Sequence, residues 1–149
     1  MKKSTKFIIA LLVTVGALAI TYRVVNQAPS KDLAADAQMQ EIITSGGCLQ
    51  CHSGSPDLPF YANWPVASGM VQKDVTQGYR AFDMTEMAEA LKAGKPVGKV
   101  ALAKVEKVIM DGTMPKHAYY MVHWGSSVTD AKKEMAMAWV KQHRLAHYA

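Results

Sequence analysis

Acidic residues are missing from the first 30 positions of this 149-residue chain, which hold none of its 12 aspartates and glutamates. The same segment holds four of the 17 lysines and arginines, so 13 basic and 12 acidic residues remain after it. The formal net charge of +5 therefore falls to +1 over residues 31–149. Because a nucleic-acid-binding domain presents a basic patch, this near-neutral remainder argues against nucleic acid as a partner.

The chain also lacks the alternation of apolar and polar residues that predicts strands, and it has no internal repeat. Its length suits one domain of ordinary size. Helical periodicity and glycine stops predict four helices, at 32–45, 83–93, 97–110 and 127 to about 147. The stretch 53–79, rich in proline, glycine and aromatic residues, is predicted as a long loop with short helical pieces that wraps something. We expect an all-α domain.

The acid-free N-terminus has the form of an export signal. Three lysines precede an apolar run from Phe7 to Ile20, which continues with breaks to Val25. As a helix, residues 7–25 would be roughly 28 Å long, close to the hydrocarbon thickness of about 30 Å. Cleavage after Ala28 would put Asn26 at the −3 position, where signal peptidase needs a small residue, so we predict that the segment is retained.

This interpretation divides the chain into a signal anchor at 1–25, a polar linker at 26–31 and a domain at 32–149. The lysines before the span hold the N-terminus in the cytoplasm. The domain is therefore expected on the periplasmic side of a bacterial inner membrane. A cleaved signal and a buried helix of a soluble protein stay open as alternatives.

Cysteine is scarce as well: the two in the chain are Cys48 and Cys51, and His52 follows directly. In an exported chain, Cys-x-x-Cys-His is typical of covalent haem c attachment, in which the thiols add to two vinyl groups and the histidine ligates the iron. A structural zinc site needs four ligands and no second cysteine pair exists. A thioredoxin-like redox dithiol is expected in a βαβ setting, which this sequence does not predict. A simple disulfide would leave His52 without a role. We predict one covalent haem c.

The second axial ligand is predicted to be Met114, one of ten methionines. It lies outside the neighbouring predicted helices in the sequence Asp-Gly-Thr-Met-Pro, where Pro115 fixes the chain and a methionine is a poor core filler. His123, His117 and an open coordination position stay open as alternatives. The other methionines are interpreted as packing or surface residues.

Further residues have weaker assignments near the haem. Arg80 is hypothesised to pair with a propionate, against the alternative of a solvated arginine. Tyr61 and Trp64 are hypothesised to pack at the haem edge, against the alternative of ordinary core. Tyr119 and His123 are hypothesised to form hydrogen bonds near the ligand loop or a propionate.

Four residues toward the C-terminus are not assigned to the site. Trp124 and Trp139 are expected in the core, because large aromatic side chains dominate apolar burial. His143 and His147 are expected to be exposed, because they lie near the end of the chain.

Several features together resemble the small haem-binding cytochrome c domain: the attachment motif, the loop Pro-Phe-Tyr-Ala-Asn-Trp-Pro at 59–65, the segment Gly-Tyr-Arg-Ala-Phe-Asp at 78–83, and Met114-Pro115 followed by Tyr119 and His123. That family is found alone behind an N-terminal anchor or fused ahead of bacterial cytochrome c peroxidases. The resemblance covers roughly residues 42–140 and implies a monohaem, mostly helical cytochrome c fold. The family often has a second proline and an aromatic residue after the methionine, whereas Lys116 and His117 stand here.

A haem closed on both sides by His52 and Met114 leaves no vacancy for oxygen or peroxide. We therefore expect an electron carrier rather than an enzyme, anchored to the membrane and passing single electrons between membrane oxidoreductases and periplasmic redox partners. A haem-based sensor or ligand-binding module, in which Met114 leaves the iron, is one alternative. A peroxidase, or a subunit that delivers electrons to one, is another.

Overall fold

The computed structural model of the chain describes residues 3–147, which form helices and turns without a strand. The helices are α1 (Lys3–Val25), α2 (Ala35–Ser45), α3 (Ser68–Ala81), α4 (Thr85–Lys92), α5 (Lys99–Asp111), α6 (His117–Val122) and α7 (Asp130–Ala146). Three short 3-10 helices are η1 (Cys48–Gln50), η2 (Phe60–Asn63) and η3 (Trp124–Ser126). The predicted all-α class is confirmed. Residues 1–2 of the predicted anchor and residues 148–149 of the predicted domain lie outside the described range.

The four helices expected from periodicity correspond to α2, α4, α5 and α7, whereas α3 and α6 were not foreseen. The prediction of a loop over 53–79 is wrong from Ser68 onward, because Ser68–Ala81 forms a helix of 14 residues. Glycine lowers helix propensity, but Gly78 is buried against the chain, and Val71 and Val75 on α3 are half-buried. Packing therefore overrides the local preference.

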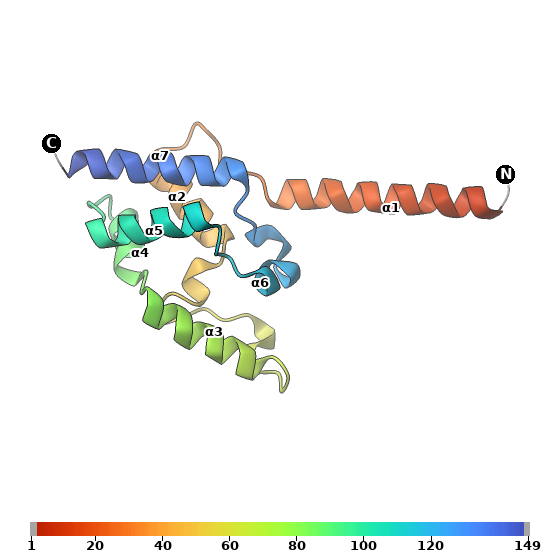
Figure 1. Cartoon of the computed structure of the whole chain (residues 1–149), viewed down its shortest axis with the longest axis horizontal. Coiled ribbons are helices and arrows are strands. Elements are labelled where there is room, and N and C mark those ends of the chain that lie inside the picture. The colour runs from red at the N-terminus through yellow and green to blue at the C-terminus, as the bar shows by residue number, and fades with distance from the viewer. Residues whose placement is uncertain (1–2, 148–149) are drawn as a thin grey trace.

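The core lies where α7 packs against α2 and α5, with α4 closing the side of α2 (Figure 1). Trp139 of α7 is 1% exposed, as predicted, and its Nε1 donates a hydrogen bond of 2.7 Å to Oδ1 of Asp36 on α2. The same carboxylate oxygen lies 2.7 Å from Nε2 of His143. The expectation that His143 is exposed is wrong, because this bond and the Trp139 ring hold its imidazole against the core.

Two other expectations about the C-terminal half are corrected. His147 is half-buried, and its Nε2 lies 2.7 Å from the carbonyl oxygen of Val97. Trp124 is 45% exposed instead of belonging to the core. It lies in η3, next to the end of α1, where the domain has no further layer to cover it.

Helix α1 projects from the domain, and no residue of it is buried (Figure 1). Within residues 3–147, it is the one helix long and apolar enough to cross a membrane, with a mean hydropathy of 2.2 in its most apolar window. A membrane anchor and an export signal share these properties. The helix is therefore compatible with both.

The segment after α1, predicted as a polar linker at 26–31, contains two buried residues, Asn26 and Pro29. Asn26 Nδ2 donates to the carbonyl oxygen of Trp124, and Asn26 Oδ1 accepts a bond of 2.9 Å from the amide of Ser127. Tyr22 at the end of α1 also shares a hydrogen bond of 2.8 Å with the hydroxyl of Ser127. The start of this segment is therefore fastened to η3.

Replacing Asp36 with alanine tests the α2–α7 contact. The Asp36→Ala change leaves the buried indole N–H of Trp139 without a partner, and an unsatisfied buried donor costs about 1–3 kcal/mol. We expect the free energy of unfolding, measured by chemical denaturation, to fall by about 2 kcal/mol. Asp57→Ala, at an exposed position without a hydrogen bond or ion pair among the described residues, is the matched control. Equal stabilities for the two variants would contradict the role of Asp36.

Candidate functional site

The predicted attachment motif forms one compact turn after α2. Gly47 has a φ of 65°, in the left-handed region, and turns the chain into η1. The amide of His52 donates a bond of 3.0 Å to the carbonyl oxygen of Cys48, and the amide of Cys51 donates one of 3.3 Å to the same oxygen. Both cysteines are free thiols, half-buried and not joined to each other. The two sulfurs and the imidazole are thus presented from a single turn.

The imidazole of His52 has a defined orientation. Its Nδ1 lies 2.8 Å from the carbonyl oxygen of Phe82, and its own carbonyl accepts a bond of 2.7 Å from the amide of Met84. Because a carbonyl oxygen can only accept, Nδ1 carries a proton, and in the neutral ring the lone pair is therefore on Nε2. A neutral histidine with Nδ1–H bonded to a backbone carbonyl is the usual form of a metal-ligating histidine.

Helix α3 supports the turn from the other side through Gly78. A Cβ atom at this position would lie 2.5 Å from the carbonyl oxygen of Cys51 and 3.0 Å from its Cβ, so only glycine fits. Four residues later, Phe82 supplies the carbonyl that orients His52. Hydrogen bonds from the hydroxyl and then the amide of Thr85, the first residue of α4, lower the pKa of the Asp83 carboxyl, and the amide bond is 2.9 Å long. Segment 78–83, noted in the sequence, therefore supports the attachment turn.

The loop that carries Met114 is fastened at two points. It follows α5, which ends at Gly112 with a φ of 61°, and Met114 is half-buried. Lys116 forms an ion pair of 2.6 Å with Asp74 on α3. Tyr119 on α6 donates a hydrogen bond of 2.6 Å to Oε1 of Gln50, inside the attachment motif. The loop is thus tied both to α3 and to the turn that carries the thiols.

A polar cluster of Tyr119, His123 and Tyr61 lies beside the thiols. His123 Nδ1 lies 3.2 Å from the carbonyl oxygen of Tyr119, and His123 Nε2 lies 2.8 Å from the hydroxyl of Tyr61. Since the carbonyl must accept, the Tyr61 hydroxyl donates to Nε2, so both ring nitrogens of His123 are engaged. Burial, with further contributions from Cys51 and Tyr61, raises the pKa of Tyr119 to about 12. Its hydroxyl therefore stays protonated and donates to Gln50.

The thiols themselves are neutral at physiological pH. Burial raises the pKa of Cys48 to about 11, although a backbone hydrogen bond and the positive charge of Lys132 act in the opposite direction. Burial and the negative charge of Asp74 raise the pKa of Cys51. Among residues 3–147, no three histidine, cysteine or carboxylate side chains gather as a metal site. The motif therefore has no further ligands with which to form a zinc centre, whereas two free thiols beside an oriented imidazole fit a haem.

The remaining predicted site residues are dispersed around this turn. Tyr61 is half-buried, and this burial raises the pKa of its hydroxyl. Cys51 raises the same pKa further, so Tyr61 lies near the thiols. Trp64 is 57% exposed and contacts the rings of Tyr61 and Phe60, so it is not ordinary core. Arg80 is exposed on α3 and has no partner among the described residues. The structure records no hydrogen bond, ion pair or ring contact between His52 and Met114, Trp64 or Arg80.

Sequence reasoning missed three of these contacts: the Phe82 carbonyl, the packing of Gly78 on Cys51, and the bond from Tyr119 to Gln50. A signal for α3 was present in Val71, Val75 and the half-buried Asp74, which recur at helical spacing. No sequence signal identifies a backbone carbonyl as a ligand partner, because every residue has one.

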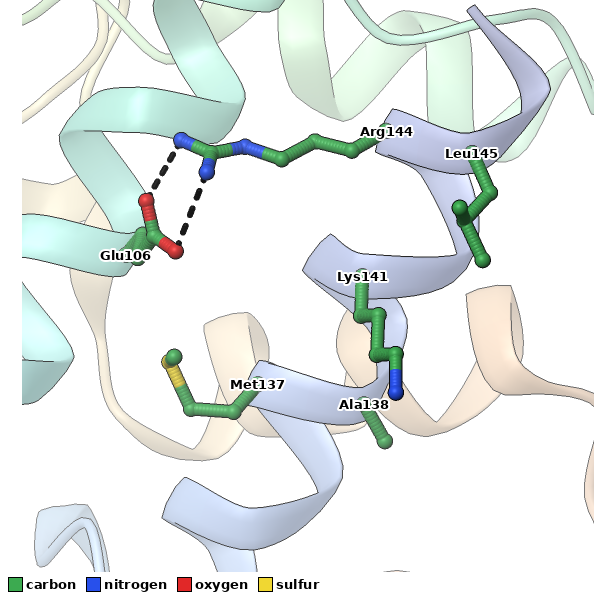
Figure 2. A pocket seen from close by; sticks show the side chains of 6 residues that line it. All are labelled: Glu106, Met137, Ala138, Lys141, Arg144 and Leu145. Carbon is green, nitrogen blue, oxygen red and sulfur yellow. Dashed lines mark hydrogen bonds and ion pairs between the residues drawn. The ribbon is translucent and has the colours of Figure 1, made fainter. Parts of the chain in front are cut away.

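A hollow of about 440 Å³ between α5 and α7 lies apart from this site (Figure 2). Across it, the guanidinium of Arg144 forms two bonds with the carboxylate of Glu106, one of 3.1 Å and one of 2.5 Å. The lining contains none of the residues predicted to hold the haem: it consists of Glu106, Met137, Ala138, Lys141, Arg144 and Leu145.

Comparison with known proteins agrees with the donor set. The family model for the haem-binding domain matches residues 7–142. The chain is 36% identical over 103 residues to the cytochrome c peroxidase Ccp of Escherichia coli (strain K12). This match covers 69% of the chain but 22% of that protein, so the chain spans less than a quarter of its relative's length. No solved structure matches the chain.

The contact between Gly47 and Tyr119 can be tested with a matched pair of glycines. A Cβ atom at Gly47 would lie 2.0 Å from the Tyr119 hydroxyl, whereas one at Gly94, with a similar φ of 61°, would meet nothing within 4 Å. Gly94→Ala should cost about 1 kcal/mol of unfolding free energy from the left-handed backbone alone. Gly47→Ala should cost about 2 kcal/mol more, because the tyrosine must move. Equal losses in chemical denaturation would show that Tyr119 does not pack on the attachment turn.

Proposed function

The chain belongs to the family of haem-binding domains, and from this premise we propose that it is a membrane-anchored c-type cytochrome that carries single electrons. The observation that carries the proposal is the state of His52. Its Nδ1 proton is committed to the Phe82 carbonyl, so Nε2 is left as a ligand, in the same turn as two free thiols.

Four side chains would hold one covalently attached haem. The sulfur and hydrogen of each thiol, at Cys48 and Cys51, would add across the carbon–carbon double bond of a vinyl group, which forms two thioethers without an oxidant. His52 Nε2 and the sulfur of Met114 would be the two protein ligands of the iron. When bound, the haem supplies an iron that alternates between two oxidation states, with a potential that these axial ligands tune.

Met114 is preferred over the two histidines for reasons of geometry. Both ring nitrogens of His123 are already engaged, with Tyr61 and with the Tyr119 carbonyl. His117 is exposed at the start of α6, where its ring contacts Tyr120. Met114 is half-buried in a loop that Lys116 and Tyr119 fasten to α3 and the attachment turn.

The surrounding residues are proposed to accommodate the rest of the cofactor. The unpartnered guanidinium of Arg80 would pair with a propionate, as arginine does bidentately with carboxylates. The rings of Tyr61 and Trp64 would contact the haem edge and exclude water from it. Tyr119, protonated by virtue of its raised pKa, would hold the attachment turn through Gln50.

The carrier role follows from ligation on both sides. With His52 and Met114 as ligands, no coordination position would remain for peroxide or a gas, and His123, a candidate acid or base in the cluster beside the thiols, already donates and accepts within the protein. Helix α1 would anchor the domain on the periplasmic side of the inner membrane, where it meets membrane oxidoreductases and soluble redox partners at high effective concentration.

A second candidate function is electron delivery to a peroxidase. It is favoured by the similarity to one part of the cytochrome c peroxidase Ccp. In this case too the residues described here would carry electrons rather than bind peroxide. The two candidates differ in the partner that receives the electron.

Optical spectroscopy of the purified full chain tests the axial ligands. We expect a sulfur-to-iron charge-transfer band in the oxidised protein and no carbon monoxide binding by the reduced protein. Met114→Ala should abolish the band, admit carbon monoxide and lower the reduction potential by on the order of 100 mV, within the span of about 0.8 V that axial ligands control. Met110→Ala, at an exposed methionine four residues earlier, is the control. Unchanged spectra for Met114→Ala would remove this residue from the site.

Replacing both thiols tests the covalent attachment. Cys48→Ser with Cys51→Ser should give a chain with no haem-stained band on a denaturing gel. The domain should also lose helical signal and unfold at lower denaturant concentration, because the haem forms part of its core. A double variant with normal stability would mean that the fold does not depend on the haem.

A further inference from the structure

Side-chain hydrogen bonds hold the junction between α1 and the domain in one arrangement. Asn26 is 3% exposed, and both ends of its amide group are used. Its Nδ2 donates to the carbonyl oxygens of Tyr22 and Trp124, and its Oδ1 accepts from the amide of Ser127. The Tyr22 hydroxyl adds a second link to Ser127. The end of α1 and η3 therefore lie at a fixed distance from each other.

Helix α6, directly before η3, has two different faces. Tyr119 of the helix and His123, the residue directly after it, lie one turn apart and form hydrogen bonds inward to Gln50 and Tyr61. Met121 and Val122 lie between them in sequence and are 62% and 69% exposed. Together with Trp124, which is 45% exposed, they form an uncovered apolar surface that we call the α6–η3 face.

This face lies where α1 leaves the domain. In Figure 1, α6 is on the side of the domain from which α1 projects, and η3 contacts α1. If α1 spans the bilayer, its last turn, with Tyr22 and Arg23, lies at the membrane interface. Residues bonded to that turn through Asn26 then lie at the level of the lipid headgroups.

The chemistry of the face suits lipid rather than a charged protein partner. Residues 117–129 contain no aspartate, glutamate, lysine or arginine. Redox and other transient protein partners are steered by complementary charges, which this stretch lacks. Tryptophan and tyrosine, in contrast, are enriched where proteins meet the membrane–water interface.

We propose that the α6–η3 face docks on the outer surface of the bilayer and that Asn26 sets this orientation. The inference rests on the proposed anchoring by α1. It goes further, because it places the redox site: Tyr119, on the inward side of α6, bonds the attachment turn, so this turn lies about one helix diameter, roughly 10 Å, from the lipid. The domain is thereby held against the membrane instead of moving on a flexible tether.

Photo-crosslinking of the full-length haem protein in lipid nanodiscs tests this placement. The probe is a phospholipid that carries a diazirine near its headgroup, and the readout is the lipid adduct on each tryptic peptide. Peptide 117–132 contains the α6–η3 face, and peptide 108–116 is the matched control, since it contains Met110 at 72% exposure. Peptide 7–23, from α1, reports insertion separately.

We expect adducts on 7–23 and on 117–132, with at least about fivefold less on 108–116, because interfacial side chains partition to the headgroup level. Replacing Met121, Val122 and Trp124 together with serine should reduce the adduct on 117–132 by a similar factor. Asn26→Ala should reduce it as well, while circular dichroism shows that the helices remain.

The failures are distinguishable. Adducts on 7–23 with only control levels on 117–132 would overturn the docking and leave the anchor intact. No adduct on either peptide would overturn both. Equal adducts on all three peptides, or crosslinks from 117–132 to a second protein chain instead of lipid, would also overturn the proposal. An unchanged yield in Asn26→Ala would show that the amide does not set the orientation.

Discussion

The hydrogen bond from His52 Nδ1 to the carbonyl oxygen of Phe82 is the interaction on which the site depends. A histidine next to two cysteines could point in several directions and carry its proton on either nitrogen. The carbonyl removes both freedoms, because it accepts only from Nδ1 and has a fixed place after α3. That place is fixed in turn by Gly78, whose missing side chain lets α3 rest on the backbone of Cys51.

Helix α6, although only six residues long, connects the parts of the molecule that the proposed function joins. Tyr119 of α6 bonds the attachment turn, and His123, the residue directly after the helix, bonds Tyr61 of η2. Its C-terminal end leads into η3, which Asn26 fastens to α1. The loop that carries Met114 enters this helix directly. A change in α6 would therefore reach the thiols, the Met114 loop and the junction with α1 together.

The comparison with the peroxidase shows the domain as a module. The chain matches about a fifth of the length of Ccp, and within residues 3–147 the buried side chains that pack the helices together include Trp139 and Leu102. Under the proposed function, such a domain would exchange electrons in the same way whether its partner is a separate protein or a neighbouring domain of the same chain. Under the same proposal, α1 would confine the domain to the membrane, where its proposed redox partners lie.

The sequence alone determined the features that depend on local chemistry: an all-α class, four of the helices, the apolar N-terminal helix and the Cys48, Cys51 and His52 motif, since periodicity and motif spacing are short-range properties. It did not determine α3, where two glycines masked a helix that packing stabilises, nor the exposure of Trp124 and the burial of His143, which depend on distant neighbours. Only the tertiary structure decided how His52 is oriented and how α1 joins the domain. The partners in both cases, the Phe82 carbonyl and the η3 backbone, are groups that every residue possesses, so their role arises solely from where the fold places them.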